Sequence, residues 1–395
     1  MNEKKLYTTA QILLDSIQTN KQTITEVLIT IESYTTIKDE MDRVTKLLRN
    51  IDKQAKFICS TEVNVIATYL PQNQPLYAYF LFGVIPSLMS KEVYIRPPLL
   101  LNKQLSELSK IFSPILNNLN LYCGSRSQFF NTIVSKADVI IFTGKYRNVK
   151  DLIKKVDGQP LVIFNGSGLN PIIISETADL EIATTNCLKA QTYNSGQDCM
   201  APMAIFVHKN IYDVFTNMLI KSVSNLKVGD YTNKSVDIGP LLSIDSFKDS
   251  INIINNHQNK ILCGGEIDHI KKIIYPTIIE FDSLSKLPIE EIYAPIYRIV
   301  KYSSIEDIKK FLLTKYIKKH AAYISYFGQS PAPEIDDHLV LLNKTIESLD
   351  DGNEAFGGYG IFSSFIFHAG CFYSRPILIS KEIAQCFSQE DRLIS

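Results

Sequence analysis

The sequence predicts an α/β protein that combines a doubly wound parallel sheet with a second α/β domain. Two observations support this prediction. From residue 63 onward, short apolar runs alternate with helix-length stretches over many cycles, a pattern typical of parallel sheets covered by helices. The chain also has 395 residues, more than one hydrophobic core usually supports, so we expect two domains.

The composition is that of an ordinary globular protein and excludes several classes of function. The 41 basic side chains balance the 41 acidic ones, so we expect no nucleic-acid partner. The chain lacks an apolar signal segment and any run of about 18 apolar residues, which predicts no membrane contact and a cytoplasmic location. Its seven cysteines form no C-x-x-C pair and no cluster has metal-ligand spacing, so we expect neither disulfides nor a metal ion.

Residues 1–62 show helical periodicity without strand patterns. Apolar side chains recur at spacings of three and four residues, as at Val44, Leu47 and Leu48. We therefore expect an amphipathic helical segment that packs on the domain that follows.

Residues 63–170 carry the pattern of a Rossmann-type domain. Strands are expected at residues 63–70, 93–96, 119–123, 139–142 and 161–164, with a helix at about residues 76–89. Doubly wound sheets bind ligands beyond the carboxyl ends of their strands, and here those ends carry Asn73 and residues 96–98, 142–144 and 165–168. A nucleotide is therefore expected at this edge.

Residues 171–365 carry the second α/β domain, with the boundary between Asn170 and Pro171. Strands are expected at residues 171–174, 203–207, 276–280, 296–300 and 321–327. The C-terminal segment, residues 366–395, holds a last strand-like run at residues 376–380 and a polar tail at residues 388–395. We expect the strand-like run to complete a partner's sheet in a homodimer.

The strongest chemical signal is the stretch Asn-Ser-Gly-Gln-Asp-Cys-Met-Ala-Pro at residues 194–202. Gly196 allows a sharp turn before Cys199, and Pro202 suits the first turn of a helix. We therefore expect Cys199 at a helix N-terminus, where the dipole would lower the pKa of its thiol. On this segment alone, a buried structural cysteine in a turn is the alternative.

The order of short motifs over residues 65–381 resembles the aldehyde dehydrogenase superfamily. The motifs are Pro-Gln-Asn-Gln-Pro at 71–75, Arg-Pro at 96–97, Phe-Thr-Gly at 142–144, Asn-Gly-Ser-Gly-Leu-Asn-Pro at 165–171, Gly-Gln-Asp-Cys at 196–199, Ile-Gly-Pro at 238–240, Gly-Gly at 264–265, Tyr-Pro-Thr at 275–277, Glu-Glu-Ile-Tyr-Ala-Pro at 290–295 and Phe-Gly-Gly at 356–358. Each motif is weak alone, but their common order is specific.

The resemblance implies an NADP- or NAD-dependent enzyme with a cysteine nucleophile. Cys199 would add to an aldehyde, and the oxyanion would receive hydrogen bonds from the Asn73 amide and the Cys199 backbone N–H. The resemblance assigns the cofactor to Arg96, Phe142, Thr143, Gly144, Lys145, Gly166, Glu291 and Tyr293, with Glu291 on the nicotinamide ribose. The alternatives are a solvated charge for Glu291 and a simple Asx turn for Asn73.

One departure from the family pattern changes the expected reaction. The general-base Glu of the family is Asn165 here, and an amide cannot take a proton from water. The resemblance then implies transfer of the acyl group to coenzyme A or a carrier thioester, or the reductive direction from an activated acyl group to an aldehyde. A catalytically decayed binding protein is the alternative.

A second departure concerns the adenosine end of the cofactor. The Lys-Pro-Ser-Glu pattern of the family becomes Arg96-Pro97-Pro98-Leu99, which lacks the acidic residue that holds the ribose hydroxyls. Because Arg96 can bind a phosphate in a bidentate manner, we expect NADP to be accepted and preferred. Lys145 either adds charge at the pyrophosphate or is solvated.

The substrate and one further class of activity are open. The resemblance places Tyr77, Phe80, Tyr193, Met200 and residues 365–372 around a substrate tunnel, although such residues are more often core. Their apolar character favours an uncharged acyl group. A cysteine hydrolase would need a histidine base near Cys199, and His208 is the nearest in sequence; His368 is expected to be core or surface.

Overall fold

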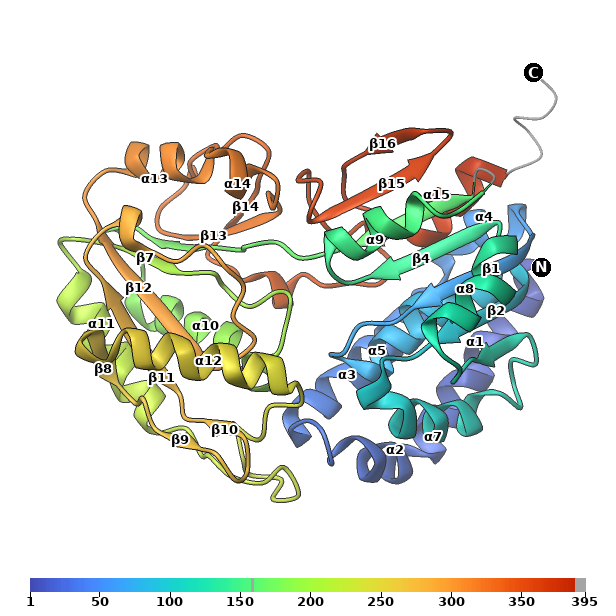
Figure 1. Cartoon of the computed structure of the whole chain (residues 1–395), viewed down its shortest axis with the longest axis horizontal. Coiled ribbons are helices and arrows are strands. Elements are labelled where there is room, and N and C mark those ends of the chain that lie inside the picture. Colours follow the sequence, from blue (N-terminus) through green and yellow to red (C-terminus); the bar gives the residue numbers. More distant parts are fainter. Residues whose placement is uncertain (158–159, 388–395) are drawn as a thin grey trace.

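The protein contains two seven-stranded sheets, one in each half of the molecule (Figure 1). The computed structural model describes residues 1–157 and 160–387. The predicted α/β class, with a Rossmann-type doubly wound sheet and a second α/β sheet, is confirmed. Among the described residues, no helix is both long and apolar enough to cross a bilayer.

Helices alone form residues 1–62. They are α1 (Glu3–Thr19), α2 (Lys21–Leu28), α3 (Tyr34–Arg49) and α4 (Asp52–Ser60), and no strand precedes β1. Asn2 caps α1 by accepting from the Lys5 N–H, and Ser33 caps α3 by accepting from the Thr36 N–H. The apolar faces of all these helices belong to the core of the first half.

The first sheet has the strand order β16-β15-β5-β4-β1-β2-β3. Its parallel strands are β1 (Val63–Tyr69), β2 (Ser90–Arg96), β3 (Leu119–Leu121), β4 (Val139–Thr143) and β5 (Leu161–Asn165). All of the predicted strands of this half are confirmed. The order reverses between β1 and β4, and a crevice for a ligand opens at such a switch point.

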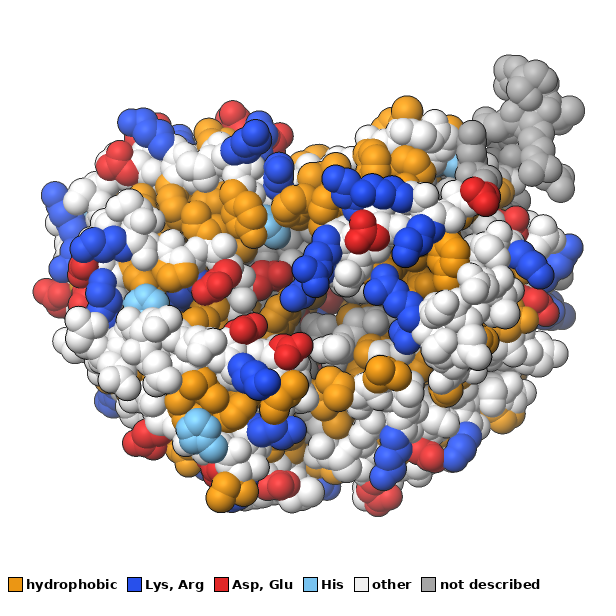
Figure 2. Space-filling view, viewed as in Figure 1, with side chains coloured by type: hydrophobic (Ala, Val, Ile, Leu, Met, Phe, Trp, Pro, Cys, Tyr) orange, Lys and Arg blue, Asp and Glu red, His pale blue; other side chains and the backbone are white. Residues whose placement is uncertain are grey.

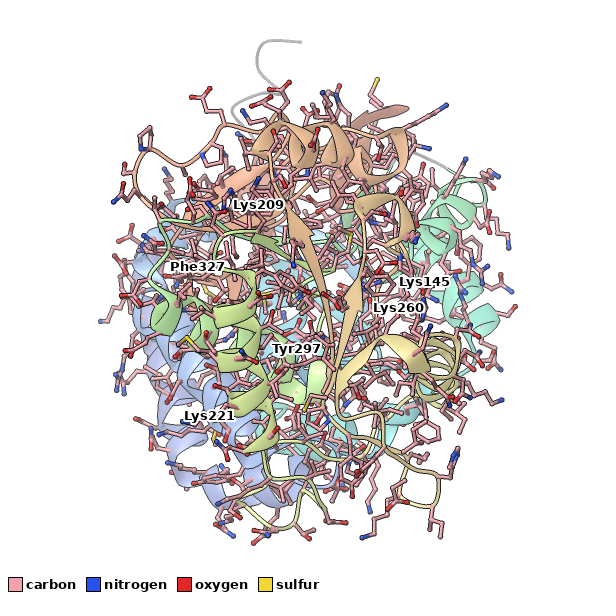
Figure 3. All side chains as sticks on the ribbon, turned by 90° about the vertical axis from the view of Figure 1, so that its left-hand side faces the viewer. Lys145, Lys209, Lys221, Lys260, Tyr297 and Phe327 are labelled. Atoms are coloured by element: carbon pink, nitrogen blue, oxygen red, sulfur yellow. The ribbon has the colours of Figure 1, made fainter. Side chains whose placement is uncertain are left out.

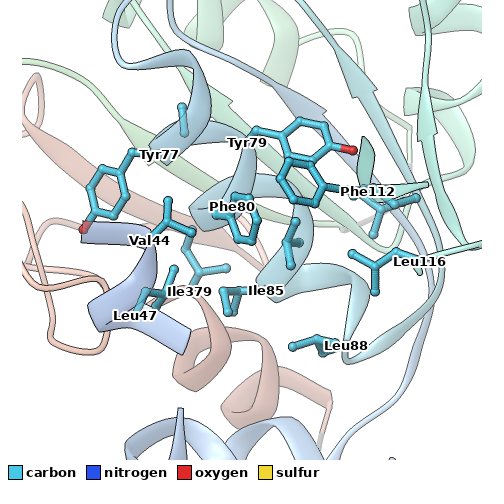
Figure 4. Close-up of a cluster of buried hydrophobic side chains, with 14 of the residues drawn as sticks. Val44, Leu47, Tyr77, Tyr79, Phe80, Ile85, Leu88, Phe112, Leu116 and Ile379 are labelled. Carbon is cyan, nitrogen blue, oxygen red and sulfur yellow. The ribbon is translucent and has the colours of Figure 1, made fainter. Parts of the chain in front are cut away.

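Helices on this sheet bury a large aromatic cluster (Figure 4). The predicted helix at residues 76–89 is confirmed as three consecutive pieces, α5 (Pro75–Tyr79), the short π-helix η1 (Phe80–Val84) and α6 (Ile85–Ser87). In the cluster, the Phe80 and Phe112 rings meet edge to face at 4.9 Å. The other helices of this half are η2 (Leu99–Leu101), α7 (Asn102–Phe112), α8 (Arg126–Thr132), η3 (Val134–Lys136) and α9 (Tyr146–Ile153).

The second sheet has the order β14-β13-β6-β7-β12-β11-β8 and is parallel except for β8. Its strands are β6 (Ile172–Ile174), β7 (Ile205–His208), β8 (Ile261–Cys263), β11 (Thr277–Phe281), β12 (Ile296–Tyr302), β13 (Tyr323–Phe327) and β14 (Leu339–Leu342), and β9 (Ile267–Asp268) pairs with β10 (Ile273–Ile274) as a separate ribbon. Tyr297 and Phe327, labelled in Figure 3, belong to one of its cores.

Helices cover the second sheet and follow its strands. The longer ones are α10 (Leu180–Thr192), α11 (Tyr212–Ser224), α12 (Ile244–Asn256) and α13 (Ile305–Leu312), and the short α14 (Lys315–Lys318) follows α13. Single turns occur at η4 (Tyr193–Gly196), η5 (Gln258–Lys260), η6 (Leu284–Lys286) and η7 (Ile346–Ser348). The strands predicted for this half are confirmed.

The C-terminal segment returns to the first half of the molecule. β15 (Ser364–His368) pairs antiparallel with β5, and β16 (Cys371–Tyr373) pairs with β15. The domain boundary predicted at residue 365 therefore falls inside a strand. This return is visible in Figure 1 as the red hairpin beside the first sheet.

The strand predicted at residues 376–380 is wrong. Only Ile377 makes a backbone bridge, to Phe356, and the helix α15 (Ile379–Phe387) begins two residues later. The reason is periodicity, because Ile379 and Ile383 recur at a helical spacing and bury one face. The Arg375–Glu382 ion pair, 2.6 Å, spans this start. Residues 388–395, predicted to be a polar tail, lie outside the described part of the chain.

Packing of α15 against α4 generates a stability prediction. Ile383 is fully buried, so Ile383→Ala should lower the free energy of unfolding by about 2–5 kcal/mol. Urea unfolding followed by circular dichroism measures this change. Gln385→Ala on the exposed side of α15 is the control and should stay within about 0.5 kcal/mol. Equal effects for both variants would contradict the described packing.

Candidate active site

A cavity of about 120 Å³ lies at the carboxyl edge of the first sheet and reaches the Cys199 loop of the second half. Figure 2 shows that the surface is hollowed between the two halves. The residues that line the cavity are Gln54, Pro71, Asn73, Gln74, Tyr77, Ala78, Leu81, Phe82, Ile85, Thr143, Asn165, Gly166, Cys199, Met200, Asp350, Asp351, Gly352, Glu354, Phe356, Ile377, Leu378 and Ile379. The cavity thus joins Asn73, Asn165 and Cys199, which the sequence places far apart.

The turn after β1 presents Asn73 to this cavity. Gln74 adopts a left-handed conformation with φ of 50°, and Pro75 then opens α5. The side chains of Asn73 and Gln74 donate to Asp198, at 3.4 and 2.9 Å. The turn is therefore tied to the loop that carries Cys199.

A strained backbone positions Cys199. Asn194, Ser195 and Gly196 are consecutively left-handed, with φ of 46°, 56° and 74°. A Cβ on Gly196 would lie 2.3 Å from the Ala294 carbonyl oxygen, so only glycine fits this close approach. Buried hydrogen bonds offset the strain, because the Ser195 hydroxyl accepts from the Gly239 N–H at 2.9 Å.

Cys199 itself lies in a turn, so the predicted helix N-terminus is wrong. No helix begins at Pro202, because the chain runs directly into β7. Burial raises the pKa of the Cys199 thiol well above its usual range, and the carboxylates of Asp198 and Glu291 raise it further. A hydrogen bond with Asn73 acts in the opposite direction. The resting thiol is therefore protonated.

Asp198 is a site residue that sequence reasoning missed. Its side chain is only 4% exposed and accepts from Asn73, from Gln74 and, at 3.0 Å, from the Met200 N–H. Burial raises the pKa of this carboxyl, although the hydrogen bonds and the Arg43 charge oppose the shift. The signal in the sequence was an acidic residue immediately before the nucleophile.

Polar atoms without partners mark the carboxyl edge of the first sheet. Among the described side chains, the Thr143 Oγ1, Asn165 Nδ2 and Arg96 Nε atoms are buried and make no hydrogen bond. They lie at the ends of β4, β5 and β2, and Gly144 follows Thr143 with φ of 147°. Because buried polar groups normally find partners, these atoms fit a polar ligand such as a dinucleotide.

The other residues predicted to bind a cofactor differ in where their side chains lie. Gly166 lines the cavity, whereas the Phe142 ring packs against Tyr69 at 5.0 Å in the core. Only the backbone of Phe142 therefore reaches the edge of the sheet, since its side chain lies in the sheet core. Exposed Lys145 begins α9 and lowers the pKa of Glu291.

Glu291 and Tyr293 hydrogen bond with each other in the segment before β12. The Tyr293 hydroxyl donates to Glu291 Oε1 at 2.9 Å. Burial raises the pKa of Glu291, opposed by hydrogen bonds from Ser167 and Tyr293 and by the charge of Lys145. The charge of Glu291 in turn raises the pKa of the Cys199 thiol.

A buried ion network beneath the cavity was also missed. The Arg43 guanidinium pairs with Asp39 at 2.7 Å and with Asp350, and its face contacts the Tyr77 and Tyr193 rings. The Tyr77 hydroxyl donates to Asp350 at 3.1 Å. No local pattern could reveal this network, because Arg43 and Asp350 are 307 positions apart.

Only some of the residues predicted for a substrate tunnel line the cavity. Tyr77 and Met200 line the cavity, but Phe80 lies in the aromatic cluster of Figure 4 and Tyr193 faces Arg43. No residue of the 365–372 stretch lines the cavity, since this stretch forms the β15–β16 hairpin.

Neither predicted histidine lines the cavity. His208 lies 3.7 Å from Glu176, and His368 contacts the Cys386 sulfur at 3.4 Å. A histidine base on Cys199 from either residue is therefore not part of this arrangement. Among the described residues, no group of three or more His, Cys, Asp or Glu side chains is arranged to hold a metal ion.

The aldehyde dehydrogenase family model matches residues 10–312 of the chain. Lactaldehyde dehydrogenase from Methanococcus aeolicus is 27% identical over 258 residues, which cover 62% of this chain and 55% of the relative. The 4,4'-diaponeurosporen-aldehyde dehydrogenase of Staphylococcus aureus is 24% identical over 353 residues, covering 85% of this chain and 76% of the relative. The chain therefore spans little more than half the length of the first of these relatives.

Solved structures share the fold at low sequence identity. The NAD+ complex of an aldehyde dehydrogenase from Bacillus cereus superposes with a TM-score of 0.80 at 20% identity, covering 96% of this chain and 82% of that one. Glyceraldehyde-3-phosphate dehydrogenase from Methanocaldococcus jannaschii, complexed with NADP, gives 0.78 at 21% identity, covering 98% and 88%.

A pair of buried carboxyls below the cavity generates a prediction about pH. Burial raises the pKa of Glu40 to about 7, and Glu40 accepts from the Tyr77 N–H at 2.7 Å beside the equally buried Glu32. A carboxyl with a raised pKa in the folded state costs stability as pH rises through that value. Glu40→Gln should therefore be more stable than the wild type at pH 8 by about 1–3 kcal/mol, with a smaller gain at pH 5.

Urea unfolding at both pH values measures this difference. Glu26→Gln on the exposed side of α2 controls for the loss of one negative charge. A Glu40→Gln variant that is less stable than the wild type at pH 8 would refute the assignment.

Proposed function

The chain belongs to the aldehyde dehydrogenase family, and on that basis we propose that it interconverts an aldehyde and an acyl group through a thioester on Cys199. Members of this family are NAD(P)-dependent oxidoreductases. The observation that carries the proposal is that Cys199, Asn73 and Asn165 line one cavity at the carboxyl edge of the first sheet. The homodimer and the cytoplasmic location remain predictions.

The nucleophile and its oxyanion contacts come from two loops. The Cys199 sulfur adds to the aldehyde carbon, and the oxygen is held by the Asn73 amide together with the Cys199 backbone N–H. Asn170 supports this geometry, since its amide donates to the Cys199 carbonyl at 2.9 Å and orients the peptide. The left-handed backbone at residues 194–196 places the loop in close contact with Ala294.

The edge of the first sheet is proposed to hold NADP or NAD, which supplies the hydride acceptor when bound. Thr143, Gly144 and Gly166 would contact its phosphates and nicotinamide, with Lys145 adding positive charge. Glu291 would accept from the nicotinamide ribose, and Tyr293 would pack beside it. The unpartnered Thr143 and Asn165 atoms support this placement.

Asn165 makes water a poor acyl acceptor. The Asn165 amide reaches the cavity but cannot remove a proton from water. We therefore propose coenzyme A or a carrier thiol as the acceptor, or the reverse direction from an activated acyl group. The lining of Leu81, Phe82 and Ile85 favours an uncharged, apolar acyl group.

A catalytically decayed binding protein is the second candidate. It is favoured by Asn165 and by the raised pKa of the Cys199 thiol, which leaves little thiolate at neutral pH. The two candidates differ in whether Cys199 becomes acylated, and this can be measured directly.

The proposed reaction predicts turnover that depends on a thiol acceptor. Purified protein with NADP or NAD and a panel of apolar aldehydes should reduce the nicotinamide about 100-fold faster with coenzyme A than without it, because water is not activated. Absorbance follows the nicotinamide, and intact mass follows acylated Cys199. Cys199→Ala should lose both signals. Cofactor binding with no acylated Cys199 in either direction would favour the binding protein.

Restoring the missing carboxylate tests the role assigned to position 165. Asn165→Glu should raise turnover without coenzyme A by about 100-fold or more, since a general base contributes this much. Asn165→Gln keeps an amide and is the matched control, so it should show no gain. Equal rates for the two variants would contradict the role of Asn165.

The cations expected at the adenosine end of the cofactor predict a preference for NADP. Arg96 ends β2 with an unpartnered Nε, and Arg126 begins the neighbouring α8. Both cations lower the pKa of the Tyr69 hydroxyl, which burial nevertheless raises to about 12. Arg96→Ala should weaken NADP binding by about 10- to 100-fold and NAD binding by much less.

Isothermal titration measures both affinities. Lys110→Ala removes an exposed cation on α7 that pairs with Glu107, and it is the control. Wild-type protein that binds NAD as tightly as NADP would contradict the preference.

A further inference from the structure

We propose that Asp39 and Arg43, on α3, are positioning residues for the reaction at Cys199. They hold the loop that ends at Cys199 against the turn that carries Asn73, and they act through Tyr193, where that loop begins. This proposal rests on the proposed function only in taking Cys199 as the nucleophile and Asn73 as the oxyanion donor.

The nucleophile and the oxyanion donor come from different halves of the molecule. Cys199 follows η4 in the second half, whereas Asn73 lies in the turn after β1 in the first half. Their separation therefore depends on contacts between the nucleophile loop, residues 193–199, and the first half. Near the end of this loop, Asp198 receives hydrogen bonds from the Asn73 turn. At its start, Tyr193 makes the corresponding link.

A single carboxylate oxygen holds the start of the loop. Asp39 Oδ2 accepts from the Tyr193 hydroxyl at 2.9 Å and pairs with Arg43 Nε at 2.7 Å. The Tyr193 ring also lies on the Arg43 guanidinium, whose carbon is 5.3 Å from the ring centroid. Tyr193 is thus fixed both by its hydroxyl and by its ring, and charged partners make such hydrogen bonds strong.

The same guanidinium contacts the side of the site that carries Asn73. Its carbon lies 5.6 Å from the centroid of the Tyr77 ring, and Tyr77 belongs to α5, which begins two residues after Asn73. The Tyr77 hydroxyl and Arg43 also share Asp350 as a partner. Arg43 therefore contacts one ring that follows the oxyanion donor and one ring that begins the nucleophile loop, so it sets the two against each other.

The nucleophile loop is held stiffly between Tyr193 and Cys199. Residues 194–196 are consecutively left-handed, and Gln197 Oε1 accepts from the Leu242 N–H at 2.7 Å. A backbone in such conformations persists only where its surroundings fix it, so it has few conformations into which it can relax. A shift of Tyr193 is therefore passed on to Cys199.

Two reactions of Cys199 separate positioning from stability, and neither needs cofactor or aldehyde. Acylation by p-nitrophenyl acetate passes through an oxyanion: the S–C bond forms, the bond to nitrophenolate breaks, and the thiol proton goes to solvent. Alkylation by iodoacetamide displaces iodide and develops no oxyanion. Mass spectrometry of the peptic Cys199 peptide follows both reactions and separates this residue from the other free cysteines.

Removal of the link should slow acylation selectively. Tyr193→Phe and Asp39→Ala should each acylate about 10- to 100-fold more slowly than the wild type and alkylate within about threefold of it, because the thiol stays in place while the oxyanion donor is misplaced. The Asp39 side chain is 34% exposed, so its truncation leaves little buried void. Arg43→Lys keeps the charge but not the planar contact with two rings, and it should show the same selective loss.

Asp39→Asn is the matched variant that keeps the acceptor. Its amide oxygen can replace Oδ2 toward both Tyr193 and Arg43, so acylation should stay within about threefold of the wild type. Tyr212→Phe removes a hydroxyl that donates to Glu280 on the second sheet, and it is the control for loss of a buried hydroxyl.

The outcomes separate this proposal from the proposed function. Unchanged acylation in Tyr193→Phe and Asp39→Ala, or equal losses of acylation and alkylation, would overturn the positioning role alone. Acylation as slow in Asp39→Asn as in Asp39→Ala would do the same. A wild type that is alkylated but never acylated at Cys199 would refute the proposed function at its nucleophile and overturn this proposal with it.

Discussion

The buried guanidinium of Arg43 is the interaction on which the arrangement of the site depends. It lies where α3, α5, η4 and the loop after η7 meet, and it contacts Asp39, Asp350, Tyr77 and Tyr193. Of these segments, α5 and the loop after η7 line the cavity, with Tyr77 and Asp350 among the lining residues. Because removal of one partner from a buried ion pair leaves an uncompensated charge, these segments hold one another in place.

The positive charge of Arg43 also offsets the negative charge of the buried carboxylates at the site. Burial raises the pKa of both the Asp198 and the Asp350 carboxyls, and the charge of Arg43 opposes the shift in each. A carboxylate beside a thiol raises the thiol's pKa, which would weaken a nucleophile that had to ionise before it attacked.

The C-terminal segment links this chemistry to the fold. β15 extends the first sheet beyond β5, and α15 packs on α4, so the chain's end closes the half in which it began. Ile377, Leu378 and Ile379 line the cavity on the way. The apolar part of the cavity lining therefore combines residues 77–85 with residues 377–379.

The sequence by itself determined the α/β class, five strands of each sheet and the order of family motifs, because these depend on local periodicity and on turns such as 71–75. It also identified Asn73, Asn165 and Cys199. Only the tertiary structure decided the raised pKa of Cys199 and the position of Asp198. Each depends on contacts between distant segments, such as Gln74 on Asp198, and burial by a distant partner leaves no local pattern.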